Sequence, residues 1–381
     1  MISPSNRLSD VKEYYFSKKL REISALEKQG KSILNIAIGS PDLAPPLNVI
    51  DALNNAALEV KANKYQSYQG LLELRQAMAD FYKTSFDVSL NPENEVLPLM
   101  GSKEGVMHIS LAFLNAGDKV LIPNPGYPTY TSVTKLLHAE PVFYNLSDAN
   151  NWQPDLEALE KQDLSGVKLM WLNYPHMPTG AQASKTLFSK LIKFAKKHKI
   201  LLVNDNPYSF ILNDNPTSIL SLPEAKEVAL ELNSLSKTFN MPGWRVGMVL
   251  GHKKYIDAVL QVKSNMDSGM YYAIQKSAIE ALKSADSWFT DLNKIYQERR
   301  KIVWQIMDTL QCTYDKDSVG LFVWGKVPSD KDAETLTDYL LAEKNIFVTP
   351  GFIFGSQGKN YIRISLCESE TLLKTALKRL V

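Results

Sequence analysis

The sequence predicts an α/β protein with a large domain, built on a mostly parallel seven-stranded sheet flanked by helices, and a smaller α+β domain. Between residues 96 and 263, short apolar segments alternate with amphipathic ones, as in a parallel sheet covered by helices on both faces. After about residue 286, a long helical segment precedes a mixture of strands and helices. A chain of 381 residues is too long for one ordinary compact core. We therefore predict a large domain at 45–285 and a discontinuous small domain at 1–44 and 286–381.

The N-terminal region is expected to be mainly helical. Residues 11–29 have apolar side chains at helical spacing and are followed by Gly30, which favours a helix end. An apolar strand at 33–38 then leads into a turn at 39–42, whose glycine lets the backbone approach a ligand closely. Two further helices are expected at 48–60 and 71–82.

The large sheet is expected to place its loops around a ligand, because open parallel sheets bind at the carboxyl ends of their strands. Its strands are predicted at 96–99, 119–122, 141–144, 168–173, 200–203, 228–232 and 247–250. The helices between them are predicted at 103–114, 130–137, 185–198 and 253–263. The small domain is expected to contain helices at 287–310, 331–341 and the C-terminus, with strands at 320–324, 346–348 and 361–366.

Composition excludes several classes of protein. With 45% hydrophobic and 22% charged residues, the chain is neither disordered nor fibrous. Its net charge of +2 and the absence of a long basic run argue against a nucleic-acid partner. Cys312 and Cys367 are expected to be reduced core thiols. No signal peptide and no run of roughly 18 apolar residues is found, so we expect a cytoplasmic protein without a membrane span.

The segment NSLSKTFNMPGWRVG, residues 233–247, contains the leading catalytic candidate, Lys237. The hydroxyls of Ser234 and Ser236 and the guanidinium of Arg245 suit a phosphate group. A lysine sheltered beside a phosphate can lose its proton and attack a carbonyl, which is the chemistry of pyridoxal phosphate. A phosphate-binding loop without covalent chemistry, or a basic surface turn, would have a similar composition.

Other loops at predicted strand ends offer complementary groups. Ser102 and Lys103 begin a helix, where free backbone N–H groups can hold a phosphate, although Ser102 can also be a simple helix cap. Tyr127 offers a flat ring and Tyr208 a phenol, and Asp205 offers a carboxylate or an Asx turn. In the small domain, Arg363 lies in an apolar strand, where an arginine is costly unless an anion pairs with it.

These segments together resemble the class I and II aminotransferases, which are fold-type I pyridoxal-phosphate enzymes. The resemblance covers nearly the whole chain and rests on GSKEG, PGYPTY, PTG, DNPY, SLSKTFNMPGWRVG and YIRISL, in that order. GSKEG and NMDSGMYYAIQ are also similar to the branch that contains the LL-diaminopimelate aminotransferases.

The resemblance implies a role for each candidate. Lys237 would hold pyridoxal 5'-phosphate as a Schiff base and move a proton, Asp205 would pair with the pyridinium nitrogen, and Tyr208 would donate to the phenolate oxygen. Further cofactor-binding residues would be Ser102, Lys103, Tyr127, Asn173, Ser234, Ser236, Arg245 and, from the neighbouring subunit of a homodimer, Tyr65. The substrate would be bound by Gly39, Arg363 and Tyr15.

One position departs from the family pattern. The asparagine that usually precedes Pro-Thr-Gly, and donates to the phenolate oxygen of the cofactor, is Met177 here. Losing such a charge-assisted hydrogen bond costs about 1.5–3 kcal/mol. Asn173 and His176 are the nearby candidates to replace it. We expect an active enzyme whose cofactor is retuned.

The implied reaction is ping-pong transfer of an amino group from an L-amino acid to a 2-oxo acid, with 2-oxoglutarate as the expected acceptor. A neutral, apolar or broad substrate range is favoured, because the segment SNMDSGMYYA contains no arginine for a second carboxylate. Residues expected to line an apolar substrate pocket are Tyr15, Phe16, Met266, Met270 and Tyr271. Alternatively, if the donor is LL-diaminopimelate, the Asp267 carboxylate would pair with its distal ammonium group.

Two rival functions use the same residues. A pyridoxal-phosphate-dependent C–S lyase would eliminate a substituent instead of exchanging amino groups. A non-catalytic sensor would keep the cofactor site beside a DNA-binding helix-turn-helix, but only about 30 residues precede the first predicted strand, which is too few for one.

Overall fold

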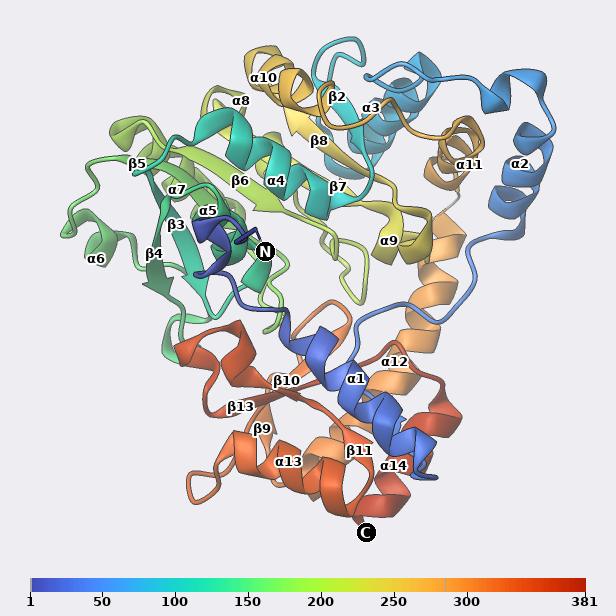
Figure 1. Cartoon of the computed structure of the whole chain (residues 1–381), viewed down its shortest axis with the longest axis vertical. Coiled ribbons are helices and arrows are strands. Elements are labelled where there is room, and N and C mark those ends of the chain that lie inside the picture. Colours follow the sequence, from blue (N-terminus) through green and yellow to red (C-terminus); the bar gives the residue numbers. More distant parts are fainter. Residues whose placement is uncertain (1, 285) are drawn as a thin grey trace.

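The computed structural model describes residues 2–284 and 286–381. A seven-stranded sheet forms the larger part of the molecule (Figure 1), in the order β2-β8-β7-β6-β5-β3-β4. Its strands are β2 (Val96–Leu99), β3 (Lys119–Asn124), β4 (Glu140–Asn145), β5 (Val167–Leu172), β6 (Leu201–Asp205), β7 (Ala229–Ser234) and β8 (Gly247–Gly251). All neighbouring pairs are parallel except those of β8, which is antiparallel to β2 and β7. The predicted mostly parallel seven-stranded sheet is confirmed.

Helices cover both faces of this sheet. Successive strand residues point to opposite sides, so each strand contributes apolar side chains to a core on either face. In β5, Leu169 and Trp171 belong to a core that also includes residues of α4, α5 and α10, whereas Met170 and Leu172 belong to the core that includes residues of α3 and α7. The helices of this part are α2 (Leu47–Ala57), α3 (Leu72–Phe86), α4 (Ser102–Phe113), α5 (Pro128–Leu136), α6 (Leu156–Glu160), α7 (Lys185–His198), α8 (Ala225–Val228), α9 (Leu235–Thr238), α10 (Lys253–Lys263) and α11 (Tyr272–Leu282).

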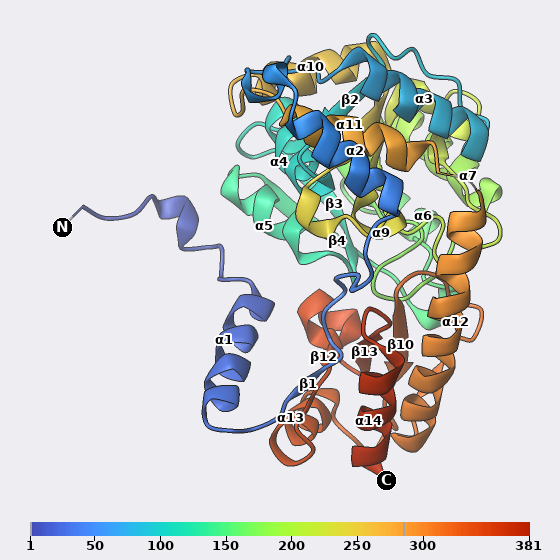
Figure 2. The ribbon, with the colours of Figure 1, turned by 90° about the vertical axis from the view of Figure 1, so that its right-hand side faces the viewer.

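A smaller group of elements combines the two ends of the chain (Figure 2). Strand β1 pairs in parallel with β11, so residues 34–35 lie beside residues 346–347. A second, antiparallel sheet has the order β12-β13-β10-β9. The elements are α1 (Tyr15–Lys28), β1 (Leu34–Asn35), α12 (Asp286–Thr309), β9 (Thr313–Tyr314), β10 (Phe322–Lys326), α13 (Ala333–Glu343), β11 (Ile346–Phe347), β12 (Thr349–Pro350), β13 (Tyr361–Ser365) and α14 (Glu370–Leu380).

Some predicted bounds were wrong near the N-terminus. The helix expected from residue 11 begins at Tyr15, and Glu13 precedes it, with its carboxylate accepting hydrogen bonds from Ser17 and Arg21 of α1. The strand expected at 33–38 is shorter, because β1 ends at Asn35. Ile36 still forms backbone hydrogen bonds with Phe347 and Ser365 before the chain reaches Gly39. Helix α11 was not predicted. The domain division at 45–285 stays a proposal, and residue 285 lies outside the described residues.

Two further expectations concern the whole chain. Cys312 and Cys367 are both free and buried, as expected of core thiols. Among the described residues, no helix is both long and apolar enough to cross a membrane.

Candidate active site

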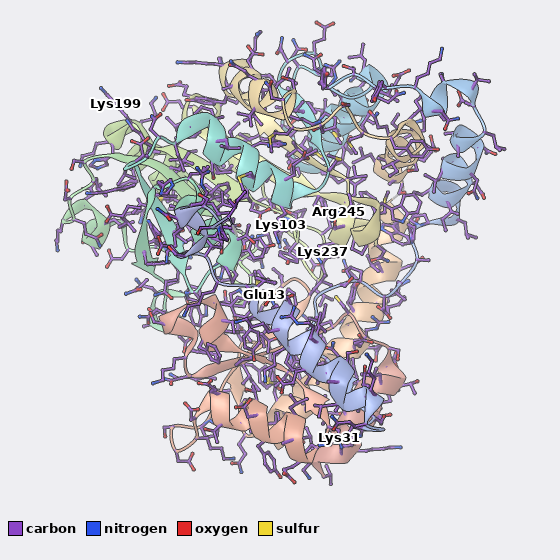
Figure 3. All side chains as sticks on the ribbon, in the orientation of Figure 1. Glu13, Lys31, Lys103, Lys199, Lys237 and Arg245 are labelled. Carbon is purple, nitrogen blue, oxygen red and sulfur yellow. The ribbon has the colours of Figure 1, made fainter. Side chains whose placement is uncertain are left out.

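A cavity of about 650 Å³ lies where the carboxyl ends of the large sheet's central strands meet α1, β10 and β13. Figure 3 shows Lys103, Lys237 and Arg245 close together in this central region. The predicted site residues that line the cavity are Gly39, Ser102, Lys103, Tyr127, Asn173, Asp205, Tyr208, Ser234, Ser236, Lys237, Arg245 and Arg363. They come from loops spread over more than 300 positions of the chain, and the sheet brings them together.

Lys237 enters the cavity from α9, a short helix that begins directly after β7. Ser234 caps this helix, because its hydroxyl oxygen accepts a hydrogen bond from the backbone N–H of Ser236 at 3.1 Å. The Lys237 ammonium donates to the Gly39 carbonyl. Burial lowers the pKa of Lys237, and the positive charges of Arg363 and Arg245 lower it further. Cys367 opposes this change. A lower pKa makes the neutral amine, which is the nucleophilic form, easier to reach.

The start of α4 forms an anion cradle beside Lys237. Gly101, with a φ of 87°, precedes the helix and offers no side chain to cap it. A Cβ on Gly101 would overlap the Arg245 guanidinium, and one on Gly247 would come within 2.7 Å of the Ser102 nitrogen. Only glycine at both positions leaves this space open. The free N–H groups of α4, together with Ser234, Ser236 and Arg245, are the donor set that a phosphate needs.

Asp205 at the end of β6 presents a carboxylate in which one oxygen accepts a hydrogen bond and the other has no donor among the described residues. Its Oδ2 accepts a hydrogen bond from the Tyr130 hydroxyl at 2.8 Å, and its buried Oδ1 has no partner among the described residues. Burial raises the pKa of Asp205 to about 6, and the Tyr130 hydrogen bond opposes this rise. A buried acceptor without a donor fits a protonated ring nitrogen.

Arg363 on β13 is buried without a carboxylate partner in the described part of the chain. Its Nη2 donates to the Ala37 carbonyl at 2.9 Å, its Nη1 lies 3.3 Å from the Met177 sulfur, and its Nε has no partner. The Phe322 ring centroid is 3.9 Å from the guanidinium carbon. Burial lowers the pKa of Arg363 to about 10, so the group stays charged at neutral pH. A buried cation of this kind is prepared to bind an anion.

Comparison with known proteins decides the family. The family model for aminotransferase class I and II matches residues 31–380. The chain belongs to the class I and II aminotransferases. It is 39% identical over 381 residues to an LL-diaminopimelate aminotransferase of Natranaerobius thermophilus, covering 100% of this chain and 99% of that protein. It is 37% identical to an LL-diaminopimelate aminotransferase of Aquifex aeolicus, with 99% and 98% coverage.

Solved structures agree with this assignment. Apo-BacF from Bacillus subtilis has a TM-score of 0.95 at 36% identity, with coverage of 100% of this chain and 97% of that one. A single mutant of the aspartate aminotransferase of Thermus thermophilus has a TM-score of 0.92 at 26% identity, with 100% and 99% coverage. The aminotransferase therefore has the fold-type I architecture and depends on pyridoxal phosphate. Its anion cradle, its buried amine and the unpartnered Asp205 oxygen fit that cofactor.

The structure corrects one predicted substrate residue of the aminotransferase. Tyr15 does not line the cavity, because its ring packs edge-on against Phe16 and Phe352 in a separate cluster. The neighbours Tyr14 and Phe16 line the cavity instead. Successive helical residues point about 100° apart, so Tyr15 and Phe16 of α1 face different sides.

Tyr65 also lies outside the cavity of its own chain. It is 91% exposed and lines a shallow groove with Met270 and Tyr271. Met266 and Tyr271 are exposed and Met270 is buried in the core, so none of them forms part of the predicted apolar pocket within this chain.

The expected partner of LL-diaminopimelate, Asp267, is also engaged elsewhere. Its carboxylate is paired with Lys263, and the closer of the two oxygens lies 2.7 Å from the lysine nitrogen.

Met177 lines the cavity, as its sequence position suggested. Of its two candidate replacements, Asn173 also lines the cavity, but its amide already donates to the Asp205 carbonyl at 2.6 Å and accepts from the Met177 N–H at 2.8 Å. His176 does not line the cavity, and burial lowers its pKa to about 3. Of these two side chains, only Asn173 therefore lines the cavity, where the missing asparagine would have to be replaced.

Sequence reasoning missed several residues of the aminotransferase site. Phe322 pairs in register with Ser365, and Trp324 pairs with Arg363, so Phe322 and Arg363 share one face of the small sheet. The alternation of residues in β10 could have revealed this. Tyr130 could not have been found in this way, because its contact with Asp205 joins residues 75 positions apart. Other lining residues not predicted are Tyr14, Ser17, Leu20, Ile38, Pro207, Pro242 and Phe354.

The raised pKa of Asp205 predicts a pH-dependent stability. Burial raises the pKa of Asp205 to about 6 in the folded, cofactor-free protein, whereas an aspartate in the unfolded chain has an ordinary pKa of 3.8. Between these values the folded state binds more protons than the unfolded state, so its unfolding free energy falls as pH rises. Cofactor-free Asp205→Asn should therefore be more stable than wild type above pH 6, by on the order of 2 kcal/mol.

Chemical denaturation of both cofactor-free proteins at pH 4 and pH 7 measures this difference. The difference should be much smaller at pH 4, where the folded-state aspartate is protonated and the unfolded-state aspartate is close to its own pKa. The same substitution should weaken cofactor binding about 10- to 100-fold, because a neutral amide cannot pair with a ring cation. An unchanged stability difference between the two pH values would contradict the prediction.

Proposed function

We propose that this aminotransferase transfers the amino group of an L-amino acid with an uncharged side chain to a 2-oxo acid, with 2-oxoglutarate as acceptor. The observation on which this rests is the cavity wall near Arg363. It is formed mainly by apolar side chains, Phe16, Leu20, Ile38, Phe322 and Phe354. Apart from Asp205, no carboxylate of the described residues lines this cavity, so one chain offers nothing to neutralise a distal ammonium.

LL-diaminopimelate is the second candidate donor. It is supported by the names of the relatives, which are 36–39% identical over nearly their whole length, and these names favour it over the uncharged donors. Its distal groups would need polar partners beyond those that line the cavity of one chain. A second subunit could supply them.

Each site residue then has a defined task. Bound pyridoxal phosphate supplies an electron-accepting ring that stores the amino group between the two half-reactions. We propose that Arg363 binds the substrate α-carboxylate through paired N–H donors and so orients the α-carbon. Lys237, whose pKa is lowered by burial, takes the α-proton and returns it. Asp205 holds the ring nitrogen, and the start of α4 with Arg245 holds the phosphate.

The donor is identified by adding single amino acids to the loaded enzyme without any oxo acid. L-methionine, L-phenylalanine, L-glutamate and LL-diaminopimelate are compared by the loss of the cofactor's visible absorbance. Restoration of that absorbance by 2-oxoglutarate, with glutamate as product, is the expected result. The ranking of donors chooses between the two candidates. Accumulation of pyruvate without glutamate would instead indicate a lyase.

We also propose a homodimer in which Tyr65 completes the phosphate site of the other subunit. Tyr65 is too exposed to act within its own chain, and it is surrounded in sequence by other exposed apolar residues, Leu58, Val60 and Leu72. A surface of this composition is typical of a subunit interface.

Mixed dimers test whether Tyr65 acts across the interface. Tyr65→Ala and Lys237→Ala should each be impaired alone, yet co-expression should recover about a quarter of wild-type activity, because half of the dimers would contain one intact site. If Tyr65 acts within its own chain, no mixed dimer has an intact site and activity is not recovered. Light scattering of each protein checks that it is a dimer.

A further inference from the structure

The Asp205 carboxylate is held at one point only. Within residues 2–284 and 286–381, the Tyr130 hydroxyl is the single hydrogen-bond donor to this side chain, at 2.8 Å from Oδ2. The other oxygen, Oδ1, is buried and has no partner. A carboxylate with a single anchor can rotate or take a proton once that anchor is lost, so Tyr130 controls both its direction and its charge.

Tyr130 is itself held rigidly. It is fully buried on α5, and its ring stacks on Trp171 with centroids 4.8 Å apart and planes 4° apart. Its other side meets the edge of Tyr127 at 5.5 Å and 87°. Burial and the neighbouring Asp205 charge raise the pKa of Tyr130 well above its usual value, so the phenol remains a neutral donor. The aromatic packing thereby fixes the point from which the hydroxyl reaches Asp205.

We propose that Tyr130 is a positioning residue for the amino-transfer reaction, which holds Asp205 Oδ2 so that Oδ1 stays ionised and available to the cofactor's ring nitrogen. The inference rests on the proposed role of Asp205. Because burial favours the protonated acid and the Tyr130 bond opposes it, loss of the hydroxyl leaves the desolvation uncompensated. A protonated Asp205 cannot stabilise a ring cation.

The test compares Tyr130→Phe with Tyr144→Phe in the loaded enzyme. Tyr144 is a matched control, since it is also fully buried and its hydroxyl donates to a backbone carbonyl, that of Trp171 at 2.6 Å, and does not touch Asp205. Tyr130→Phe should weaken cofactor binding and lower kcat about 10-fold to 100-fold, with the amino-acid KM changed less than about 3-fold. It should also move the pH titration of the cofactor's visible absorbance. Tyr144→Phe should change none of these.

A second substitution strengthens the hydrogen bond to Asp205 instead of removing it. Replacing Tyr130 by 3,5-difluorotyrosine keeps the ring and strengthens the donor, so the absorbance titration should shift in the opposite sense to that of Tyr130→Phe. In the cofactor-free protein, carbon NMR of Asp205 should show a higher pKa in Tyr130→Phe than in wild type.

The outcomes separate this inference from the proposed function. If wild type binds no cofactor or shows no half-reaction, the proposed function fails. If wild type is active and Tyr130→Phe matches it, or if Tyr144→Phe is impaired equally, the positioning role of Tyr130 is overturned. Opposite shifts of the phenylalanine and fluorotyrosine proteins support it.

Discussion

Replacing Lys237 by alanine is expected to lower kcat by about 10,000-fold or more, because the same amine both attacks the cofactor's carbonyl and moves the α-proton. The fold should be retained, since within the described part of the chain the Lys237 side chain makes one hydrogen bond, to the Gly39 carbonyl, and no ion pair. The measurement is half-transamination under single-turnover conditions. It reports the chemical step directly and is independent of product release.

A covalent readout accompanies the rate. Borohydride reduction of the loaded wild-type enzyme should leave the cofactor's mass on a peptide that contains Lys237, and Lys237→Ala should acquire none. Lys31→Ala is the control, because Lys31 is an exposed lysine far from the cavity (Figure 3). Attachment to Lys103, the other lysine that lines the cavity, would show that the wrong amine has been assigned.

Replacing Arg363 by leucine is expected to lower kcat/KM for the amino acid by about 100- to 10,000-fold, because two charge-assisted hydrogen bonds to the substrate carboxylate are lost. The free energy of unfolding should not fall together with kcat/KM. Arg363 is a buried cation without an acidic partner in the part of the chain that the structure describes, and an apolar residue of similar size removes its desolvation cost. We therefore expect the unfolding free energy of the cofactor-free protein to be unchanged or higher.

Arg299 provides the contrasting control. It is also buried, but it forms a bidentate pair with Asp42, at 2.6 and 2.9 Å. Arg299→Leu should destabilise the protein by about 1–3 kcal/mol, because it leaves Asp42 partly buried without its partner. Thermal and urea unfolding measure both variants. Equal destabilisation by the two substitutions would contradict the assignment of Arg363 as a cation kept for a ligand.

The strands of the large sheet could be predicted because each is a short apolar run between polar or turn residues. All seven predictions end within two residues of the observed ends, and β2 matches at both ends. The antiparallel direction of β8 could not be predicted, because the side-chain pattern of a fully buried strand is the same for both directions.

The site was predictable for a related reason. Lys237, Asp205 and Ser102 each follow a predicted strand, and the carboxyl ends of neighbouring strands meet at one edge. Whether Tyr14, Tyr15 or Phe16 faces the cavity depends on how α1 packs against the rest of the molecule, and the apolar periodicity of 11–29 does not report this.

The sequence by itself therefore determined the α/β class and most of the residues that line the cavity with Lys237, because these depend on local periodicity and on residue type. Only the tertiary structure decided which of Asp205's oxygens is free, which tyrosine holds the other, and that Arg363 has no acidic partner among the described residues. Those properties depend on distances between side chains far apart in the chain. Packing sets these distances, and no local pattern of the sequence records them.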